Sequence, residues 1–490
     1  MPTEPTDNRP NLLFICVDQW RADALGFAGH PVAETPHLDR LAHEGVNFTQ
    51  AYAATPTCVP ARATIFTGLS PRHTGFVGYN DHIDWRYDVT LPGLLADAGY
   101  HTQCVGKMHT HPARNLMGFH NVILHDGYLH RERAKRDDYG LVDDYTPWLR
   151  ERLGPQADYI DSGVGCNGYA ARPWPYDEML HPTSWVTSQS IDFLRRRDPT
   201  KPFFLMMSYH RPHPPLDPPQ SFLDRYLAKE LPDPVMGDWA PDALPVRGLD
   251  SPVPTDAAQR DYARRAYYAQ ISHIDYSLNR MFQALYENGV LDNTAIVFTS
   301  DHGEMLYDHN HIAKGYPFDS SARLPFILRL PKSADVHQAG RASQQVRQVD
   351  QVIELRDLLP TFCDLAGVAV PDHIDGRSIL PLVRGETDGW RPYLHGEHFL
   401  HADSNQWLTD GREKYVWYSQ SGRELLFNLA NDPTELHDLS GESAARVAVW
   451  RERLIEELAG REEGFVQDGA LVAGRPQRPT LTDAGVYRKR

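Results

Sequence analysis

The chain has 490 residues, 41% of them hydrophobic, and a formal net charge of 49 − 65 = −16. A chain of this length exceeds what a single hydrophobic core usually serves, so we expect one large domain and one smaller one. The acidic balance argues against nucleic acids and anionic membranes as partners, because their phosphates would be repelled. An anionic substrate would need positive charge concentrated in its binding site.

Cysteine content and the first residues bear on the compartment. The five cysteines, at positions 16, 58, 104, 166 and 363, are too few and too scattered for a disulfide framework. Residues 1–10 are polar and contain no hydrophobic signal core, and no apolar run approaches membrane-spanning length. We therefore expect a cytoplasmic protein with no membrane partner.

Apolar runs and helical segments alternate along the first three quarters of the chain. The long apolar runs predict strands buried on both faces, at 11–17, 100–105, 202–208 and 293–299, with a further strand at 323–329. Capping residues predict the helices between them, at 36–45, 59–67, 90–99, 183–196 and 256–288. This alternation is typical of an α/β fold with a large, mostly parallel sheet flanked by helices.

Two regions depart from that alternation. Residues 110–182 show no sustained period, and we interpret them as a substrate-facing insertion. Residues 393–398 and 414–428 predict strands of a small antiparallel sheet, and 444–463 a charged amphipathic helix. We therefore divide the chain into a catalytic α/β domain, 1–380, and a C-terminal α+β subdomain, 381–490.

Polar residues follow the predicted buried strands at their C-terminal ends. In a parallel sheet these ends share one edge, where ligands bind. Two ligand pairs, at 18–19 and 301–302, could therefore meet around one divalent cation despite their separation in sequence: Asp18, Gln19, Asp301 and His302. The oxygen ligands suit Ca²⁺, Mg²⁺ or Mn²⁺, and the imidazole of His302 makes Mn²⁺ a stronger candidate than oxygen ligands alone would. Zinc is the alternative offered by His109-x-His111 and His309-x-His311, but no cysteine accompanies these pairs.

The segment Thr55–Thr64 reads as a turn followed by the start of a helix. Pro60 suits a first helical turn, and Gly68 can end a short helix. Cys58 then lies at the helix N-terminus, where free N–H groups and the helix dipole attract anions and lower a thiol pKa. Arg62 lies one turn further on the same face. The simpler interpretation is a small buried thiol beside a surface arginine.

The residue pattern of this segment favours a catalytic role. Cys-Val-Pro-Ala-Arg at 58–62, continuing to Thr67-Gly68, resembles the signature of type I sulfatases in the alkaline phosphatase superfamily. The resemblance covers most of the chain and leaves out 110–182 and 465–490. Further matching segments are Gly-Lys-Met-His at 106–109, Pro-His-Pro-Pro at 212–215, the segment 353–367, Asp-Gly-Arg-Ser at 375–378 and Asn-Asp-Pro-Thr-Glu-Leu at 431–436.

The resemblance implies a fold, a modification and a set of roles. In that family a maturation enzyme oxidises the cysteine, here Cys58, to formylglycine, and the hydrated aldehyde is the nucleophile that attacks a sulfate ester. A divalent cation accompanies it, with Ca²⁺ favoured. The implied catalytic residues besides Cys58 are Arg62, Lys107 and Lys314 around the sulfate, His109 as acceptor of a formylglycine hydroxyl proton, and His213 as proton donor to the leaving oxygen. The substrate would be a small-molecule or saccharide sulfate ester.

Two positions depart from the commonest sulfatase pattern. Gln19 stands where many members have a second Asp, and His302 where many have Asn, so the sequence is also similar to phosphonate monoester hydrolases and choline sulfatases. A phosphonate monoester or phosphodiester hydrolase with the same nucleophile is therefore an alternative, although those hydrolases resemble Tyr and Thr where this chain has Lys107 and His109. A catalytically silent anion-binding relative is a further alternative, and an unmodified Cys58 would favour it. A homo-oligomer is compatible with the sequence.

Overall fold

A sheet of eight strands forms the centre of the protein. The computed structural model describes residues 7, 9–127, 142–244, 253–254, 256–333 and 345–482. The strand order is β10-β2-β9-β7-β1-β6-β4-β5. β1 pairs in parallel with β6 and β7, and β4 with β5 and β6, whereas β9 is antiparallel to β2 and β7. The strands are β1 Asn11–Asp18, β2 Val46–Phe48, β4 His101–Gly106, β5 Asn121–Leu124, β6 Phe203–Pro212, β7 Thr294–Ser300, β9 Phe326–Arg329 and β10 Arg347–Val349.

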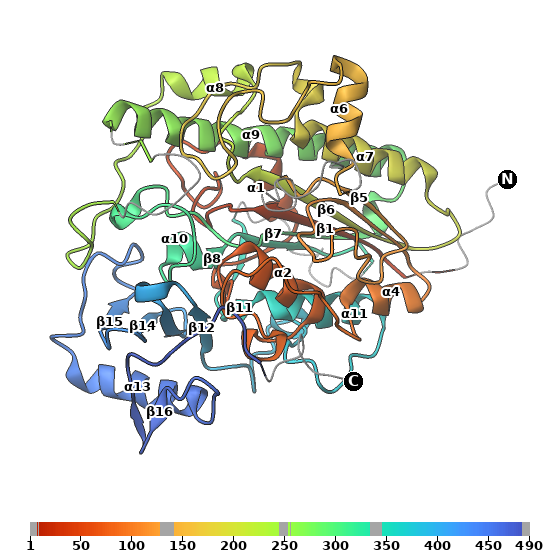
Figure 1. Ribbon diagram of the computed structural model, residues 1–490. Helices are drawn as coiled ribbons and strands as arrows, with labels where there is room; N and C mark the ends of the chain where they lie inside the picture. Colours follow the sequence, from red (N-terminus) through yellow and green to blue (C-terminus); the bar gives the residue numbers. More distant parts are fainter. Residues whose placement is uncertain are drawn as a thin grey trace.

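Helices cover both faces of this sheet (Figure 1). Alternate residues of β1 belong to different hydrophobic clusters, with Leu13 and Ile15 packed toward α9 and Phe14 packed toward α11. Burial on both faces explains why the parallel strands read as continuous apolar runs, and the predicted α/β fold is confirmed. One face carries α1 Pro36–Glu44, α7 Pro182–Arg196, α8 Gln220–Leu227 and α9 Ala257–Glu287; the other carries α2 Cys58–Thr67, α4 Leu91–Asp97 and α11 Leu358–Ala366.

The single strand predicted at 323–329 is wrong. The segment forms two strands in different sheets, β8 Arg323–Leu324 and β9 Phe326–Arg329. Pro325 separates them, because proline has no N–H to donate to a sheet. β8 joins a small three-stranded sheet with β3 Ala51–Tyr52 and β11 Ile353–Glu354.

The irregular stretch 110–182 contains part of the main sheet. β5 forms its edge strand beside β4, and α6 Tyr145–Leu153 follows. Residues 128–141 of the stretch lie outside the described residues. A substrate-facing role for this region stays a prediction, but 121–124 belong to the sheet.

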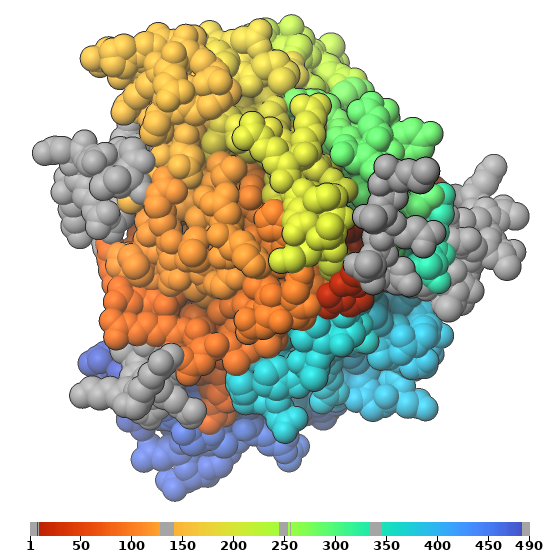
Figure 2. All heavy atoms as spheres, turned by 90° about the vertical axis from the view of Figure 1, so that its right-hand side faces the viewer, coloured from red at the N-terminus to blue at the C-terminus, as the bar shows by residue number. Residues whose placement is uncertain are grey.

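A second, antiparallel sheet lies toward the C-terminus, as predicted. In Figure 2 the C-terminal residues, in blue, lie at the bottom of the molecule, below the orange residues of the earlier part of the chain. Tyr415 and Trp417 pack against Trp450 of α13. The elements are β12 Leu394–His398, β13 Asn405–Thr409, β14 Glu413–Tyr418, β15 Glu424–Asn428, α13 Ala444–Leu458, and a hairpin of β16 Val466–Gln467 and β17 Ala470–Leu471.

The remaining short helices are α3 Pro71–Thr74, α10 Asp319–Ala322 and α12 Leu380–Val383. All five cysteines are buried, and none forms a disulfide within the described part of the chain. Within the described residues, none of the helices has both the length and the apolar character needed to cross a bilayer.

Candidate active site

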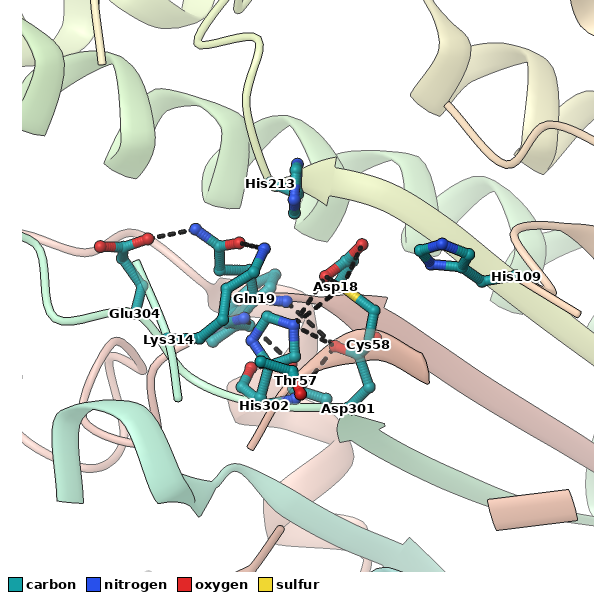
Figure 3. Close-up of polar contacts among 12 residues, drawn as sticks. Asp18, Gln19, Thr57, Cys58, His109, His213, Asp301, His302, Glu304 and Lys314 are labelled. Atoms are coloured by element: carbon teal, nitrogen blue, oxygen red, sulfur yellow. Dashed lines mark hydrogen bonds and ion pairs between the residues drawn. The ribbon is translucent and has the colours of Figure 1, made fainter. Parts of the chain in front are cut away.

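Polar side chains converge where the central strands end. Asp18 is the last residue of β1, and Asp301 and His302 directly follow β7. The parallel register pairs Val17 with Ser300, so the residues that follow them lie side by side. All three side chains are fully buried. Figure 3 shows them grouped beside Cys58, with His213 above and His109 to one side.

Cys58 enters this group from the N-terminus of α2. Its Sγ lies 3.2 Å from Nε2 of His302 and 3.7 Å from Oδ1 of Asp18, and the residue is 2% exposed. Gly68 ends the helix in the left-handed region at φ 67°, as the sequence predicts. The preceding Thr57 is held by a hydrogen bond of 2.9 Å between its Oγ1 and Nε2 of His398 in β12. The C-terminal sheet therefore helps to position residue 58.

Positive side chains surround Cys58. Lys107 forms an ion pair with Asp18, and Arg62 donates from Nε to Oδ2 of Asp301 at 2.9 Å and from Nη1 to the Lys107 carbonyl at 2.7 Å. Burial and the Asp18 carboxylate would raise the pKa of the Cys58 thiol, but Lys107 and Lys314 outweigh them, and the pKa lies below its ordinary value. The site therefore favours negative charge at residue 58.

The donor set fits a divalent cation. One ligand atom from each of Asp18, Cys58, Asp301 and His302 lies within 4.8 Å of the others. Nδ1 of His302 donates to the Gly303 carbonyl at 2.9 Å, so its Nε2 lone pair faces carboxylate oxygens at 3.3 Å and 3.7 Å. A lone pair facing carboxylates is repulsive unless positive charge lies between them. Burial lowers the pKa of His302 but Asp301 and Cys58 raise it above its ordinary value, so these neighbours favour positive charge, either a proton or a cation, at Nε2.

Gln19 stands apart from this donor set. Its side-chain nitrogen donates to Glu304, and its Oε1 accepts from Nζ of Lys314 at 2.5 Å (Figure 3). Glu304 also accepts a hydrogen bond of 2.6 Å from the Tyr169 hydroxyl. The structure thus brings Asp18, Asp301 and His302 together, while the Gln19 amide bridges Glu304 and Lys314. Its role as a metal ligand stays a prediction.

Two histidines flank the group without joining it. The backbone N–H of His109 donates to Oδ1 of Asp126 at 2.9 Å, and its Nδ1 is buried with no hydrogen-bond partner among the described residues. Nδ1 of His213 donates to the Pro214 carbonyl at 2.8 Å, which leaves Nε2 for the site. Burial lowers the pKa of both rings well below the ordinary value, helped by Lys107 at His109 and by Lys314 at His213. Both rings therefore favour the neutral form.

Sequence reasoning missed the residues that hold these groups in place. Glu304 lies two positions beyond His302 in the same segment, so proximity could have suggested it. Tyr169 and Asp126 carry no sequence signal, because only the folded chain brings them to Gln19 and His109. The zinc alternative gains no support, since neither group of potential metal ligands within the described ranges includes His111, His309 or His311.

A buried site that places Arg62, Lys107 and Lys314 around a thiol at a helix N-terminus fits a hydrolase of anionic esters. The Sulfatase family model matches residues 10–368, and a model for the C-terminal part of N-sulphoglucosamine sulphohydrolase matches residues 307–462. An arylsulfatase of Clostridium perfringens is 46% identical over 483 residues, covering 96% of this chain and 98% of the relative. The chain belongs to the sulfatase family, and it is a sulfuric ester hydrolase.

Two further similarities bear on the alternative activity. A phosphonate monoester hydrolase of Agrobacterium radiobacter has a solved structure with a TM-score of 0.75, 29% identity, and coverage of 96% of this chain and 100% of that one. The multifunctional alkaline phosphatase superfamily protein PehA of Trinickia caryophylli is 29% identical, covering 89% of this chain and 92% of the relative.

Proposed function

We propose that this sulfatase hydrolyses sulfate monoesters, aryl sulfates among them, with Cys58 converted to formylglycine and one divalent cation held by Asp18, Asp301 and His302. The observation that carries the proposal is the ring of positive side chains around residue 58. Ca²⁺ is our first choice of cation, with Mn²⁺ favoured next by the imidazole of His302. Gln19 is the fourth ligand we propose, through its amide oxygen.

Charge in the site matches what sulfate transfer requires. The bound cation would supply electrostatic stabilisation of the sulfate oxygens. Lys107 and Lys314 add fixed positive charge in a buried environment, where each interaction is stronger than in water. Arg62 fixes the geometry, because it bonds both Asp301 and the backbone of Lys107, and its Nη2 has no hydrogen-bond partner within the described part of the chain.

The histidines supply proton transfer. A hydrated aldehyde at residue 58 offers two hydroxyl groups, one to attack sulfur and one to lose its proton when the sulfate is expelled, which a serine could not do. His109, neutral and with an unpaired buried Nδ1, would accept that proton. Nε2 of His213 is left for the site; the negative charge of a bound sulfate ester would favour protonation there, and Nε2 would then pass this proton to the leaving oxygen.

A phosphonate monoester or phosphodiester hydrolase is the second candidate. Its support is the similarity to the Agrobacterium hydrolase and the Asp18-Gln19 pair. Lys107 and His109 speak against it, because those hydrolases resemble Tyr and Thr at these positions. The physiological ester, including a saccharide sulfate, and a formylglycine-generating maturation enzyme as partner belong to the proposal, as does a cytoplasmic location.

The test uses enzyme produced together with a formylglycine-generating enzyme and supplied with Ca²⁺ or Mn²⁺. Its tryptic peptide around residue 58 should be lighter than the cysteine form by about 18 Da. A panel of aryl sulfates, sulfated sugars and phosphonate monoesters is then assayed, with a Cys58→Ala variant as control. We expect a sulfate ester to give the highest kcat/KM. A higher value for a phosphonate monoester than for every sulfate would establish the second candidate, and an active enzyme with unmodified Cys58 would refute the nucleophile.

A further inference from the structure

A third histidine, His210, lies beside the site, and the roles described above do not use it. It lies near the end of β6, three residues before His213, and is 3% exposed. The two rings have their centroids 4.8 Å apart. A ring nitrogen of His210, one of His213 and a carboxylate oxygen of Asp18 lie within 4.8 Å of one another. His210 therefore faces the same space as the predicted proton donor.

The hydrogen bonds of the two rings fix opposite tautomers. Nη1 of Arg211 lies 2.6 Å from Nδ1 of His210. A guanidinium can only donate, so Nδ1 of His210 must accept, and the ring proton sits on Nε2. In His213 the bond to the Pro214 carbonyl puts the proton on Nδ1 instead, which leaves Nε2 as the atom that gains and loses a proton.

The tautomer of His210 is held by a buried ion pair. Arg211 binds Asp217 through two parallel bonds, Nε to Oδ1 at 2.9 Å and Nη2 to Oδ2 at 3.0 Å, and both side chains are buried. On the other side, a Cβ added to Gly127 would lie 2.1 Å from Cδ2 of His210, so the ring rests directly on that backbone. The imidazole can neither rotate freely nor accept a second proton while Arg211 donates to it.

Asp18, His210 and His213 do not suit a second metal ion, although the distances between their ligand atoms would allow one. Asp18 already forms an ion pair with Lys107, and the guanidinium of Arg211 lies against the His210 ring. A further cation between two fixed positive groups would be repelled. Because Nδ1 accepts from Arg211, Nε2 of His210 carries the ring proton and is a donor, not a ligand.

We propose that His210, held by Arg211 and Asp217, donates a hydrogen bond from Nε2 to the leaving-group oxygen of the sulfate ester, beside His213. As the formylglycine oxygen bonds to sulfur, the S–O bond to the leaving group breaks and its electron pair passes to the leaving oxygen. His213, protonated at Nε2 in the complex with the anionic ester, then delivers that proton to it. The proton of His210 is not transferred. It stabilises the charge that develops on the oxygen, so His210 is a catalytic residue, and Arg211 and Asp217 are positioning residues. The inference rests on the proposed sulfate-ester hydrolysis and extends it to leaving-group stabilisation.

The test compares two aryl sulfates with different leaving groups. Phenyl sulfate releases a basic phenolate, whereas 4-nitrophenyl sulfate releases one that carries its charge more easily. His210→Phe keeps a ring but removes the donor, and we expect its kcat to fall about 10²-fold on phenyl sulfate, the size typical of losing one preorganised donor. On 4-nitrophenyl sulfate the loss should be below about tenfold. His210→Gln, whose amide N–H can replace Nε2, should retain most of the phenyl sulfate activity.

The matched control is His273→Phe. His273 is another buried imidazole, hydrogen-bonded to Ser184 and packed on His181 with ring centroids 4.8 Å apart. The His273→Phe variant should keep the wild-type ratio of kcat on phenyl sulfate to kcat on 4-nitrophenyl sulfate, even if it lowers stability. An equal loss on both esters in His210→Phe, or equal losses in His210→Phe and His210→Gln, would overturn the inference alone. A wild type that cleaves neither ester would overturn the proposed function, and this inference with it.

Discussion

Two clusters of buried charged side chains can be compared: the active site at the strand ends of the main sheet, and a group around Lys414 in the C-terminal sheet. Nζ of Lys414 donates to Oδ1 of Asp319 at 2.5 Å and to Oε1 of Glu435 at 2.7 Å, between the rings of Tyr52 and Trp407. Asp319 is also paired with Arg323 at 3.0 Å. The charges of this cluster are balanced by one another.

The active site is built from the same residue types and also contains buried donors without partners. Nη2 of Arg62 and Nδ1 of His109 are buried and have no hydrogen-bond partner among the residues described. Each such group costs about 1–3 kcal/mol when nothing bonds it. Unpaired buried donors occur in both clusters, since Nε of Arg323 and Nε1 of Trp407 also have no hydrogen-bond partner among the described residues. What sets the active site apart is the group of potential metal ligands that its charges surround. The Lys414 cluster joins two parts of the fold, and the site around Cys58 is prepared for a ligand.

Asp301→Asn should have the largest effect on the active-site side of this comparison. The amide keeps the shape but removes the charge that faces His302 and Arg62, so bound cation and activity should be lost together. A cation contributes several kcal/mol to the transition state, so we expect a fall in kcat/KM of at least about 10³-fold. Elemental analysis and initial rates check this. Asp319→Asn, which changes the other cluster, should keep its metal; near-stoichiometric zinc retained by Asp301→Asn would contradict the metal assignment.

His109→Thr should lower sulfate-ester turnover by about 10²–10⁴-fold, the range typical of losing a general base. Hydrolysis of a phosphonate monoester should fall less, because a hydroxyl side chain can serve there. The measurement is kcat on both ester classes for the same preparation. His111→Thr, two residues away, provides the control and should change neither rate appreciably. Equal losses on both ester classes would show that His109 has no role specific to sulfate.

Lys414→Met tests the balanced cluster. Removing one partner leaves Asp319 and Glu435 as buried carboxylates, so the free energy of unfolding should fall by about 3–5 kcal/mol. Activity per folded molecule should stay unchanged, since Lys414 bonds Asp319 and Glu435, neither of which has a proposed role in the reaction. Denaturant titration checks the loss of stability, and rates normalised by active-site titration check the activity per folded molecule. Adding Glu435→Gln to Lys414→Met should recover part of the loss; a loss of kcat without a loss of stability would mean that the clusters are not separable.

The smallest effect is expected at Asp275 in α9, as a change in how the free energy of unfolding depends on pH. Asp275 accepts hydrogen bonds from the backbone N–H groups of His37 and Leu38, and burial raises its pKa to about 7. Between pH 4 and 7 the folded chain therefore holds a proton that the unfolded chain has released, so this group's contribution to stability falls as pH rises. The slope is at most about 1.4 kcal/mol per pH unit. Asp275→Asn should flatten the pH dependence of unfolding in that window; an unchanged curve would exclude the raised pKa.

The sequence predicted the parts of the fold that depend on local pattern. The four long apolar runs became β1, β4, β6 and β7, and Pro60 and Gly68 bound the helix that carries Cys58. The order of strands along the sheet then brought Asp18 and Asp301 together. These features were accessible because hydrophobic periodicity and capping are properties of short segments.

What the sequence could not predict depends on contacts between distant segments. β2 and β10 are only three residues long, and pairing with partners far along the chain decides their conformation. The bridge from Glu304 through Gln19 to Lys314 has the same origin. So does the tautomer of His210, which a neighbouring arginine fixes only because Asp217 orients that arginine.

The strand order has a consequence for the time course of synthesis. β1 lies between β6 and β7, so the edge that holds Asp18 cannot be complete until Ser300 has been made. About 240 residues separate Cys58 from that point, which at 5–20 residues per second is roughly 10–50 s of translation. In the folded chain Cys58 is 2% exposed. A second protein that acts on its sulfur therefore has this interval, before the central strands pair, in which the thiol is accessible on the growing chain.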